Sequence, residues 1–304
     1  MQIDTVSLKE ICAKFIRDLN YRPGRLIQDD NASYRALKKE FAQYNTAAWF
    51  DNMCREAAAV AEFVYPDHSE EIRIQIAKYS WFIIYVDDMG QKTPENLKNF
   101  QRCILKGTSE PETEFFQAFP KHLDEYYRLF DPIPANCIAL CAMDFINGCL
   151  LEEMPKIKGM KLTDASLSWP YFLRNKTGAA QAYAFMLFPK EVNVDMTTYI
   201  QVVEDIALYL NLTNDILSFY KEHMAGERHN YICNRAAATQ RSIEETLRDV
   251  VKDAMQAHSR VTRVLESSGN RSALDIWGKC VNGFFGFHFS LKRYRLEELD
   301  SSAL

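Results

Sequence analysis

Several features that would point to other classes of protein are missing from this sequence. No block rich in Lys and Arg stands out and the net charge is −5, so we do not expect a protein that holds nucleic acid through phosphate contacts. The densest apolar run, residues 79–86, is far shorter than the roughly 20 residues that cross a bilayer. Acidic residues at positions 4, 10 and 18 interrupt any signal-peptide core near the N-terminus. We therefore expect a cytoplasmic protein without membrane contact.

Paired cysteines are also missing, although the chain has eight cysteines in all. None of them form a CxxC pair. Cys137 and Cys141 share one helix face, but no second pair or histidine cluster completes a zinc site. We interpret the cysteines as reduced, mostly packed thiols of a reducing compartment.

The alternation of apolar and polar residues that indicates strands is nearly absent, whereas helical periodicity dominates. Proline and glycine fall where breaks between helices are needed. No repeat, low-complexity tract or linker divides the chain, so we predict one all-α domain over residues 1–304, with about the first 35 residues peripheral. The predicted helices cover residues 7–19, 38–64, 69–88, 94–106, 112–130, 134–154, 165–177, 179–188, 196–224, 239–267 and 271–299.

The segment "NDILSFYKE", residues 214–222, places three oxygen-bearing side chains four residues apart. Asn214, Ser218 and Glu222 therefore share one helix face and form an oxygen ladder over two turns. Oxygen ligands with one formal charge suit Mg²⁺, which takes its remaining ligands from water and substrate phosphate. Asp215 points about 100° away on the helix and is a poorer candidate. The alternative is a solvated polar face with an i,i+4 hydrogen bond.

A second acidic feature ends the apolar run of residues 79–86, where Asp87 and Asp88 follow directly. A carboxylate at the end of a buried helix opens onto the cavity that a helical bundle encloses. Unpaired charge is costly there, so such acids typically bind divalent cations. The alternative is a pair of aspartates that emerge into water at the end of a helix. With the oxygen ladder elsewhere in the chain, metal-dependent diphosphate binding accounts better for both features.

Cationic groups that could complement this site occur at several points of the chain. They are Arg174, Lys221, Arg228 and Arg293, the last followed by Tyr294. Each one alone is more often a surface residue. Together they would supply the hydrogen-bond donors that a leaving diphosphate requires.

These motifs resemble those of class I terpene synthases. "NDILSFYKE" matches the (N/D)D-(L/I/V)-x-(S/T)-x-x-x-E metal-binding signature, and "YVDDMG" stands where that family has its aspartate-rich motif. The resemblance covers about residues 70–299 and is closest to fungal sesquiterpene cyclases of the trichodiene synthase type. The segments that match in order and spacing are "MDFINGCLLEE" (143–153), "FLRNKTG" (172–178) and "RYRLEEL" (293–299).

The resemblance implies a single helical bundle around a deep cavity, three Mg²⁺ ions and a linear isoprenoid diphosphate as substrate, which is farnesyl diphosphate in the nearest relatives. It assigns two of the magnesium ions to Asp87, with Asp88 a weaker candidate, and the third to Asn214, Ser218 and Glu222. Relatives often form homodimers, which makes a homodimer the candidate assembly.

The same resemblance assigns the diphosphate contacts. Arg174 matches the diphosphate-sensing arginine, and Lys221, Arg293 and Tyr294 match the remaining contacts. The backbone at Thr177 and Gly178 corresponds to a helix break beside the allylic carbon of the substrate.

Two departures from the family pattern indicate a relative with a different product. The aspartate motif usually has another acid three or four positions after its first pair, whereas residues 90–92 are Gly, Gln and Lys. Asp87 would then do most of the metal binding on its helix. Leu291 stands where close relatives often have an aspartate, so a salt bridge expected on closure is missing.

Helical spacing from the two acidic motifs predicts which side chains line the apolar part of the cavity. Aromatic residues at helical spacing are often only core, so we expect about half of this set to lie outside the cavity. The predicted lining residues are Tyr79, Ser80, Ile83, Ile84, Phe145, Tyr183, Leu210, Asn211, Phe284 and His288.

The sequence thus predicts a sesquiterpene synthase that ionises farnesyl diphosphate, cyclises the carbocation and releases diphosphate. Two alternatives stay open. A chain-elongating prenyl diphosphate synthase shares the fold and metals but carries two DDxxD motifs, whereas the triad at the second position favours cyclisation. A non-catalytic helical isoprenoid-binding protein would tolerate the missing third acid.

Overall fold

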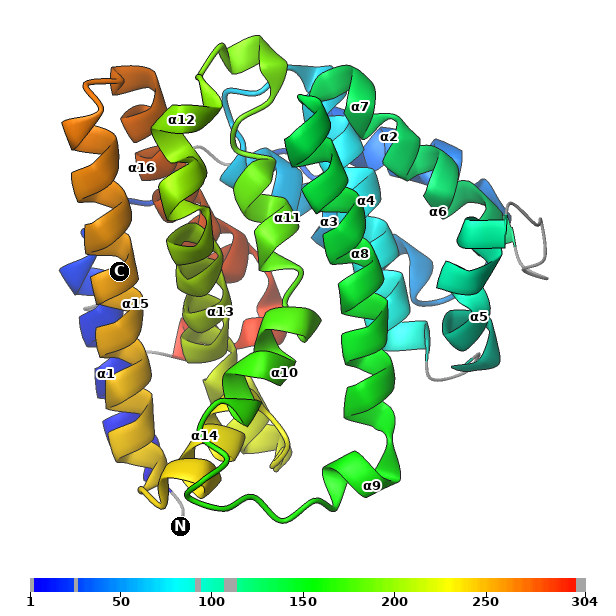
Figure 1. Cartoon of the computed structure of the whole chain (residues 1–304). Coiled ribbons are helices and arrows are strands. Elements are labelled where there is room, and N and C mark those ends of the chain that lie inside the picture. The colour runs from blue at the N-terminus through cyan, green and yellow to red at the C-terminus, as the bar shows by residue number, and fades with distance from the viewer. Residues whose placement is uncertain (1–2, 25–26, 91–93, 107–113, 299–304) are drawn as a thin grey trace.

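The computed structural model describes residues 3–24, 27–90, 94–106 and 114–298, and within these ranges every regular element is a helix (Figure 1). The predicted all-α class is confirmed. The α-helices are α1 (Thr5–Asp18), α2 (Ala32–Glu40), α3 (Phe50–Val64), α4 (Glu70–Met89), α5 (Pro94–Lys106), α6 (Glu114–Asp124), α7 (Tyr126–Leu129), α8 (Pro132–Glu153), α9 (Pro155–Lys158), α10 (Trp169–Thr177), α11 (Ala180–Phe185), α12 (Met196–Tyr199), α13 (Val203–Ala225), α14 (Tyr231–Thr239), α15 (Ile243–Ser267) and α16 (Arg271–Ser290). The short 3₁₀ helices are η1 (Ala42–Tyr44), η3 (Lys190–Val192), η4 (Ile200–Val202), η5 (Lys292–Tyr294) and η6 (Leu296–Glu298).

Two long helices, α4 and α13, carry the acidic motifs at their C-terminal ends. The hydroxyl of Ser69 caps the start of α4 by accepting a hydrogen bond from the backbone N–H of Ile72 at 3.4 Å. Helix α13 stops at Gly226, whose left-handed φ of 77° costs glycine little and lets its N–H close the last turn. Glu222 therefore lies in the last turn of α13, as Asp87 lies in the last turn of α4.

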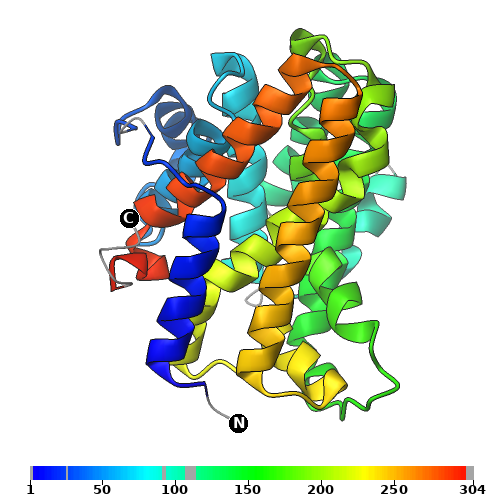
Figure 2. The ribbon, with the colours of Figure 1, turned by 90° about the vertical axis from the view of Figure 1, so that its left-hand side faces the viewer.

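The helices pack around these two. Helix α3 packs on α4 and α16, α13 packs on α11 and α15, and α8 packs on α10 and α11. Figure 1 shows α8, α13 and α15 running roughly along the same direction, and Figure 2 shows α16 crossing at an angle. Glycine allows the close crossing of α3 and α16, since a Cβ at Gly283 would lie 1.8 Å from the carbonyl oxygen of Phe63.

One helix in the described ranges, α8, is long and apolar enough by composition to span a bilayer. Half of its most apolar window is buried within the bundle, where it packs on α10, α11, α4 and α5. Core helices of large helical bundles pass the same test of length and composition.

The predicted helix over residues 38–64 is wrong, because the chain turns between Phe41 and Trp49. This stretch contains neither glycine nor proline, so nothing in the local sequence marks the turn. The turn wraps aromatic side chains around Trp81 of α4: the ring of Phe41 stacks on it at 3.7 Å, and those of Tyr44 and Trp49 lie within 6.5 Å. Packing of these rings against Trp81, a tertiary effect, favours the turn over a continuous helix.

Other predicted helices also divide. Among the described residues, the stretches predicted as 112–130 and 196–224 contain breaks, and the last predicted helix ends at Ser290, after which η5 folds back onto α13. The expectation of a peripheral N-terminus does not hold for α1. Its Leu8, Cys12 and Phe15 are fully buried against the bundle, and the thiol of Cys12 reaches the carbonyl of Ile216 on α13 at 3.6 Å. Figure 2 shows α1 beside α15.

Candidate active site

A cavity of about 730 Å³ opens between α3, α4, α8, α10, α11, α13, α16 and η5. Its volume falls in the range of roughly 300–1,000 Å³ that is typical of small-molecule sites. Most of the residues predicted from the sequence surround it. Those that line it are Ile84, Asp87, Asp88, Arg174, Thr177, Gly178, Tyr183, Leu210, Asn211, Asn214, Ser218, Lys221, Glu222, Phe284, Arg293 and Tyr294.

Polar and apolar lining residues are separated along the helices. On α4, Ile84 precedes Asp87 by about one turn, and on α13, Leu210 precedes Asn214 by one turn. The charged residues lie at the C-terminal ends of both helices. The cavity therefore has a charged mouth and an apolar interior.

Asp87 and Asp88 occupy an electrostatically unfavourable position, because the C-terminal end of a helix carries a partial negative charge. Asp87 is exposed to the cavity but makes no ion pair with any described residue. The protein that surrounds its carboxylate, and then the charge of Asp88, raise the pKa of Asp87 to about 6. Carboxylates held without a partner in this way are suited to bind cations.

The triad on α13 presents its oxygens to the same cavity. The buried Ser218 hydroxyl has no hydrogen-bond partner among the described residues. Burial raises the pKa of Glu222, while the nearby Ser218 and then Lys221 act in the opposite direction. Asn214 Oδ1 accepts a hydrogen bond from Arg174 Nη2 at 3.1 Å. A buried hydroxyl without a hydrogen-bond partner beside a half-buried carboxylate is what an oxygen-ligated cation would satisfy.

The mouth as a whole favours positive ligands. Among the described lining residues are eight carboxylates against five Lys and Arg side chains, so the mouth is acidic. No three His, Cys, Asp or Glu side chains converge as a complete metal site in the part of the chain that the structure describes. The candidate donors, Asp87 on one wall and the triad on the other, therefore fit cations that take further ligands from a substrate phosphate.

Arg174 is fixed by α13. Its Nε donates to both carboxylate oxygens of Asp215, at 2.7 and 2.9 Å, and its Nη2 also donates to the backbone carbonyl of Asn211 at 3.1 Å. Asp215 thus faces Arg174 rather than the triad, in keeping with its poor position as a metal candidate.

The other cationic candidates gather around Tyr294. Lys221 Nζ lies 5.2 Å from the centre of the Tyr294 ring, within cation–π range. Arg293 Nη1 forms an ion pair with Glu56 of α3 at 2.5 Å, which ties η5 across the mouth to α3. The structure therefore brings Lys221, Arg293 and Tyr294 to the same cavity as Arg174.

The expected helix break lies between α10 and α11. Helix α10 ends at Thr177, and the left-handed φ of 49° falls on Ala179 rather than on Gly178. Gly178 is required for another reason: a Cβ there would lie 1.8 Å from Asn211 Oδ1. Both polar atoms of the buried Asn211 amide lack hydrogen-bond partners among the described residues. The break thus brings unpaired polar groups against the cavity.

Aromatic and aliphatic side chains form the interior. Two of these side chains are tyrosines whose hydroxyls are hydrogen-bonded to protein. The Tyr65 hydroxyl donates to the backbone carbonyl of Tyr183 at 2.8 Å, and the Tyr183 hydroxyl donates to Ser80 Oγ at 3.1 Å. The apolar lining residues are Val60, Val64, Tyr65, Ile84, Ala180, Tyr183, Leu210, Phe284 and Phe287.

Five predicted lining residues do not line this cavity: Tyr79, Ser80, Ile83, Phe145 and His288. All are buried, because neighbouring helices cover the faces that point away from the cavity. The ring of Tyr79 packs on those of Tyr126 and Tyr183, and Ser80 lies behind Tyr183. His288 lies behind Asn214, with its Nε2 3.1 Å from Asn214 Nδ2.

Sequence reasoning missed several residues at the mouth. Glu152 and Glu153 end the apolar helix α8 just as Asp87 and Asp88 end α4, so the same signal could have found them. Burial, and then the charge of Asp87, raise the pKa of Glu152 to about 7. Glu56 does not lie at the end of an apolar helix, so the sequence gives no comparable indication that it lines the cavity. Arg228, one of the predicted cationic groups, does line the cavity, whereas the other polar lining residues that were not predicted to lie there are Lys158, Asp215, Glu227, His229, Asn230 and Tyr231.

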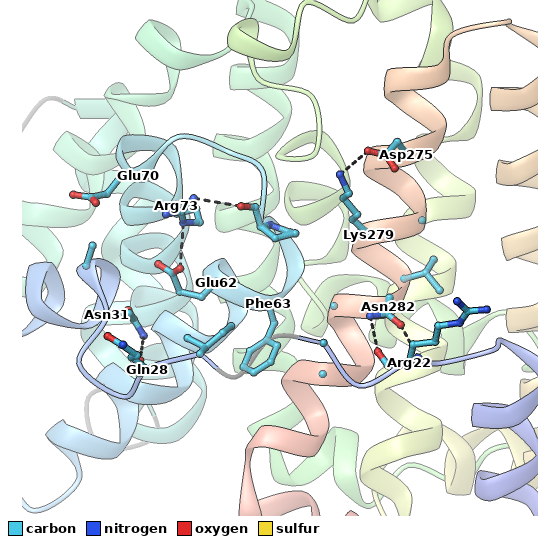
Figure 3. Close-up of a pocket in the computed structure, with 18 of the residues that line it drawn as sticks. Arg22, Gln28, Asn31, Glu62, Phe63, Glu70, Arg73, Asp275, Lys279 and Asn282 are labelled. Atoms are coloured by element: carbon cyan, nitrogen blue, oxygen red, sulfur yellow. Dashed lines mark hydrogen bonds and ion pairs between the residues drawn. The ribbon is translucent and has the colours of Figure 1, made fainter. Parts of the chain in front are cut away.

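A larger cavity of about 1,120 Å³ lies between residues 19–24 and 27–35, α3, α4 and α16 (Figure 3). None of the predicted site residues line it. Its charged groups largely pair with one another, as in the contacts of Arg73 with Glu62 and of Lys279 with Asp275. We therefore take the 730 Å³ cavity, and not this one, as the candidate active site.

Comparisons with known proteins indicate the class to which this fold and site belong. The chain is 32% identical over 293 residues to terpene synthase BipA of Cochliobolus sativus, covering 95% of this chain and 89% of the relative. It is 30% identical to an (E)-beta farnesene synthase of Metarhizium brunneum, covering 80% of this chain and 73% of the relative. The fold is similar to that of a linalool/nerolidol synthase from Streptomyces clavuligerus, solved with 2-fluorogeranyl diphosphate, with a TM-score of 0.59, 13% identity and coverage of 89% and 97%.

The fold is thus that of the class I terpenoid synthases. The trichodiene synthase (TRI5) family model matches residues 31–303, and the chain belongs to this family of terpene synthases.

Proposed function

We propose that this protein is a sesquiterpene synthase that ionises farnesyl diphosphate with the help of Mg²⁺, cyclises the resulting carbocation and releases diphosphate. The observation that carries the proposal is that Asp87 of α4 and the triad of α13 line the charged mouth of one cavity whose interior is apolar. Class I chemistry needs both halves together, because ionisation requires charge at the diphosphate while the carbocation requires a dry pocket.

The residues at the mouth would bind and orient the diphosphate. Asp87, Asn214, Ser218 and Glu222 are the oxygen donors for magnesium, which when bound supplies Lewis-acid stabilisation of the leaving group. Arg174, Lys221 and Arg293 would donate charge-assisted hydrogen bonds to the diphosphate oxygens. Their positions, fixed by Asp215, Tyr294 and Glu56, leave little reorganisation for the ionisation step.

The residues of the interior would shape and protect the carbocation. Tyr65, Tyr183, Phe284 and Phe287 offer ring faces that stabilise positive charge without reacting with it. The tyrosine hydroxyls are engaged with protein acceptors, so they are not free to quench the cation. Because the apolar lining residues offer no base, the released diphosphate is the proposed base for the final deprotonation.

The choice of a C15 substrate rests on the family and on the relative named as an (E)-beta farnesene synthase. The C10 diphosphate analogue in the structure of the linalool/nerolidol synthase makes geranyl diphosphate the competing substrate to test.

The experiment incubates the purified protein with geranyl, farnesyl or geranylgeranyl diphosphate, with and without Mg²⁺, and analyses the extracts by gas chromatography–mass spectrometry. A cyclic C15 hydrocarbon or alcohol formed only with farnesyl diphosphate and Mg²⁺ supports the proposal. Longer prenyl diphosphates, formed when isopentenyl diphosphate is added, would instead indicate chain elongation. Unchanged substrate in every incubation would indicate an isoprenoid-binding protein without activity.

A further inference from the structure

His288 on α16 is fully buried directly behind Asn214, the first residue of the triad. Its ring is held on three sides by aromatic neighbours, with ring centres 4.5 Å from Tyr294, 4.6 Å from Phe284 and 4.9 Å from Phe287. Both ring nitrogens are within hydrogen-bond distance of a polar atom: Nδ1 is 2.7 Å from the backbone carbonyl of Phe284 and Nε2 is 3.1 Å from Asn214 Nδ2. The ring therefore has one fixed plane and two fixed partners.

These partners determine which nitrogen carries the proton. A backbone carbonyl can only accept, so Nδ1 must carry a hydrogen and donate it to Phe284. The ring is fully buried and makes no ion pair with a described carboxylate, and an unpaired buried charge is costly, so Nδ1 carries the one ring proton and Nε2 keeps its lone pair. Nε2 is consequently an acceptor, and the side-chain NH₂ of Asn214 donates to it.

This tautomer in turn determines the orientation of the Asn214 amide. With Nδ2 turned to His288, Oδ1 points to the opposite side, where it accepts a hydrogen bond from Arg174 Nη2 at 3.1 Å. In the flipped amide, Oδ1 would face the lone pair of His288 Nε2 and the NH₂ group would face the guanidinium of Arg174. Both contacts would then be repulsive, so His288 and Arg174 favour the same orientation.

We propose that His288 is a positioning residue, which holds the Asn214 amide with its oxygen toward the cavity as a ligand for the divalent cation. The role of the oxygen as a ligand rests on the proposed function; the orientation rests on the hydrogen bonds alone. Asn is the one triad member whose side chain has two chemically different ends, so it is the one that needs an orienting partner.

The test replaces His288 by Phe, which keeps an aromatic ring but removes the acceptor. Binding of Mg²⁺ with inorganic pyrophosphate is measured by isothermal titration calorimetry, without turnover. We expect His288→Phe to weaken Mg²⁺-dependent pyrophosphate binding by about 10- to 100-fold, the usual cost of losing a group that orients a metal ligand. His122→Phe is the matched control, since His122 is also buried among rings but its ring neighbours, Phe82 and Tyr126, do not line the cavity, and this variant should bind as the unaltered protein does.

The same substitution in an Asn214→Asp background separates orientation from general damage. A carboxylate has two equivalent oxygens and needs no orienting partner, so His288→Phe should then change binding by no more than about twofold. Equal losses in both backgrounds would show a merely structural role and overturn the proposal. Melting curves by circular dichroism check the fold, and His288→Met replaces His288→Phe if the latter does not fold.

A direct measurement of the tautomer completes the test. Nitrogen-15 NMR of labelled protein, with the signals of His288 identified by their loss in the variant, should show an unprotonated Nε2 and a protonated Nδ1. A protonated Nε2 would overturn the proposal. Absence of Mg²⁺-dependent pyrophosphate binding in the unaltered protein would contradict the proposed function, whereas normal binding in His288→Phe would contradict only the role of His288.

Discussion

Arg174 on α10 and Asp215 on α13 form a two-pronged ion pair in which one nitrogen, Nε, donates to both carboxylate oxygens at 2.7 and 2.9 Å. The side chains are only 12% and 11% exposed. The pair lies beside the helix break at Gly178 and anchors the candidate diphosphate-sensing arginine to the helix of the candidate metal-binding triad. Asp215 therefore contributes to the position of Arg174 even though it is not a candidate ligand itself.

Asp215→Asn should destabilise the protein, because it leaves the charge of Arg174 largely buried and uncompensated. We expect the free energy of unfolding to fall by about 3 kcal/mol, as for other buried pairs that lose one partner. Chemical denaturation measures this value. Asp205→Asn is the control: its ion pair with Arg260 is more exposed, at 24% and 47%, and should contribute no more than about 1 kcal/mol.

Glu222→Gln should abolish most turnover while the fold survives. The substitution keeps the size of the side chain but removes the one formal charge of the triad, and we expect a loss of about 100-fold or more in kcat/KM. The control, Glu266→Gln on the exposed face of α15, should leave turnover unchanged. Full activity of Glu222→Gln would remove the triad from the site.

The two neighbouring aspartates of α4 should differ in importance. Asp87→Asn should lower kcat/KM by about tenfold more than Asp88→Asn, since the family resemblance makes Asp87 the main candidate metal ligand on α4 and Asp88 a weaker one. The electrostatic environment agrees: Asp87 lies in the field of Arg293, Lys221 and Arg174, the three cations proposed to bind the diphosphate. Equal losses in steady-state kinetics would contradict this assignment.

At neutral pH and without bound cations, Glu152 should lower the free energy of unfolding of the protein. The pKa of Glu152 is raised from 4.5 to about 7 by burial and then by the charge of Asp87. Between these two values the folded protein binds more protons at Glu152 than the unfolded chain does, so this group makes the free energy of unfolding fall as the pH rises through the window. The destabilising effect of Glu152 is absent at a pH well below 4.5 and complete at a pH well above about 7.

Glu152→Gln should therefore raise the melting temperature near pH 8 and change it much less near pH 5, by about 2–4 °C for each kcal/mol relieved. Differential scanning calorimetry in the presence of a chelator measures both values. An increase of the same size at both pH values would mean that Glu152 does not titrate in this window.

Gly178→Ala should be strongly disruptive although alanine favours helices. The added Cβ would lie 1.8 Å from Asn211 Oδ1 and 2.7 Å from Arg174 Nη1, so α10, α13 or both must shift. We expect the free energy of unfolding to fall by about 1–3 kcal/mol. The opposite sign is expected for Gly278→Ala in α16, where no atom lies within 4 Å and the loss of unfolded-state entropy stabilises by about 0.4–1 kcal/mol. Denaturation of both variants under the same conditions checks the contrast.

The sequence by itself determined the features that depend on one helix. The period of the α-helix is enough to put Asn214, Ser218 and Glu222 on one face, to put Asp87 at the end of an apolar helix, and to select the all-α class. The break at Gly178 was also predicted, since glycine within a helical pattern weakens it. Each of these follows from backbone geometry within a few residues.

Only the tertiary structure decided which side chains from other helices meet these residues. Nothing local marks the turn at Phe41, the ion pair of Glu56 with Arg293, or the contact of His288 with Asn214, because each depends on how α3 and α16 cross their neighbours. Periodicity predicts which residues share a face, but not which neighbour covers that face. Tyr79 and Ser80 were for this reason predicted to line the cavity, and packing against α7 and α11 placed them in the core instead.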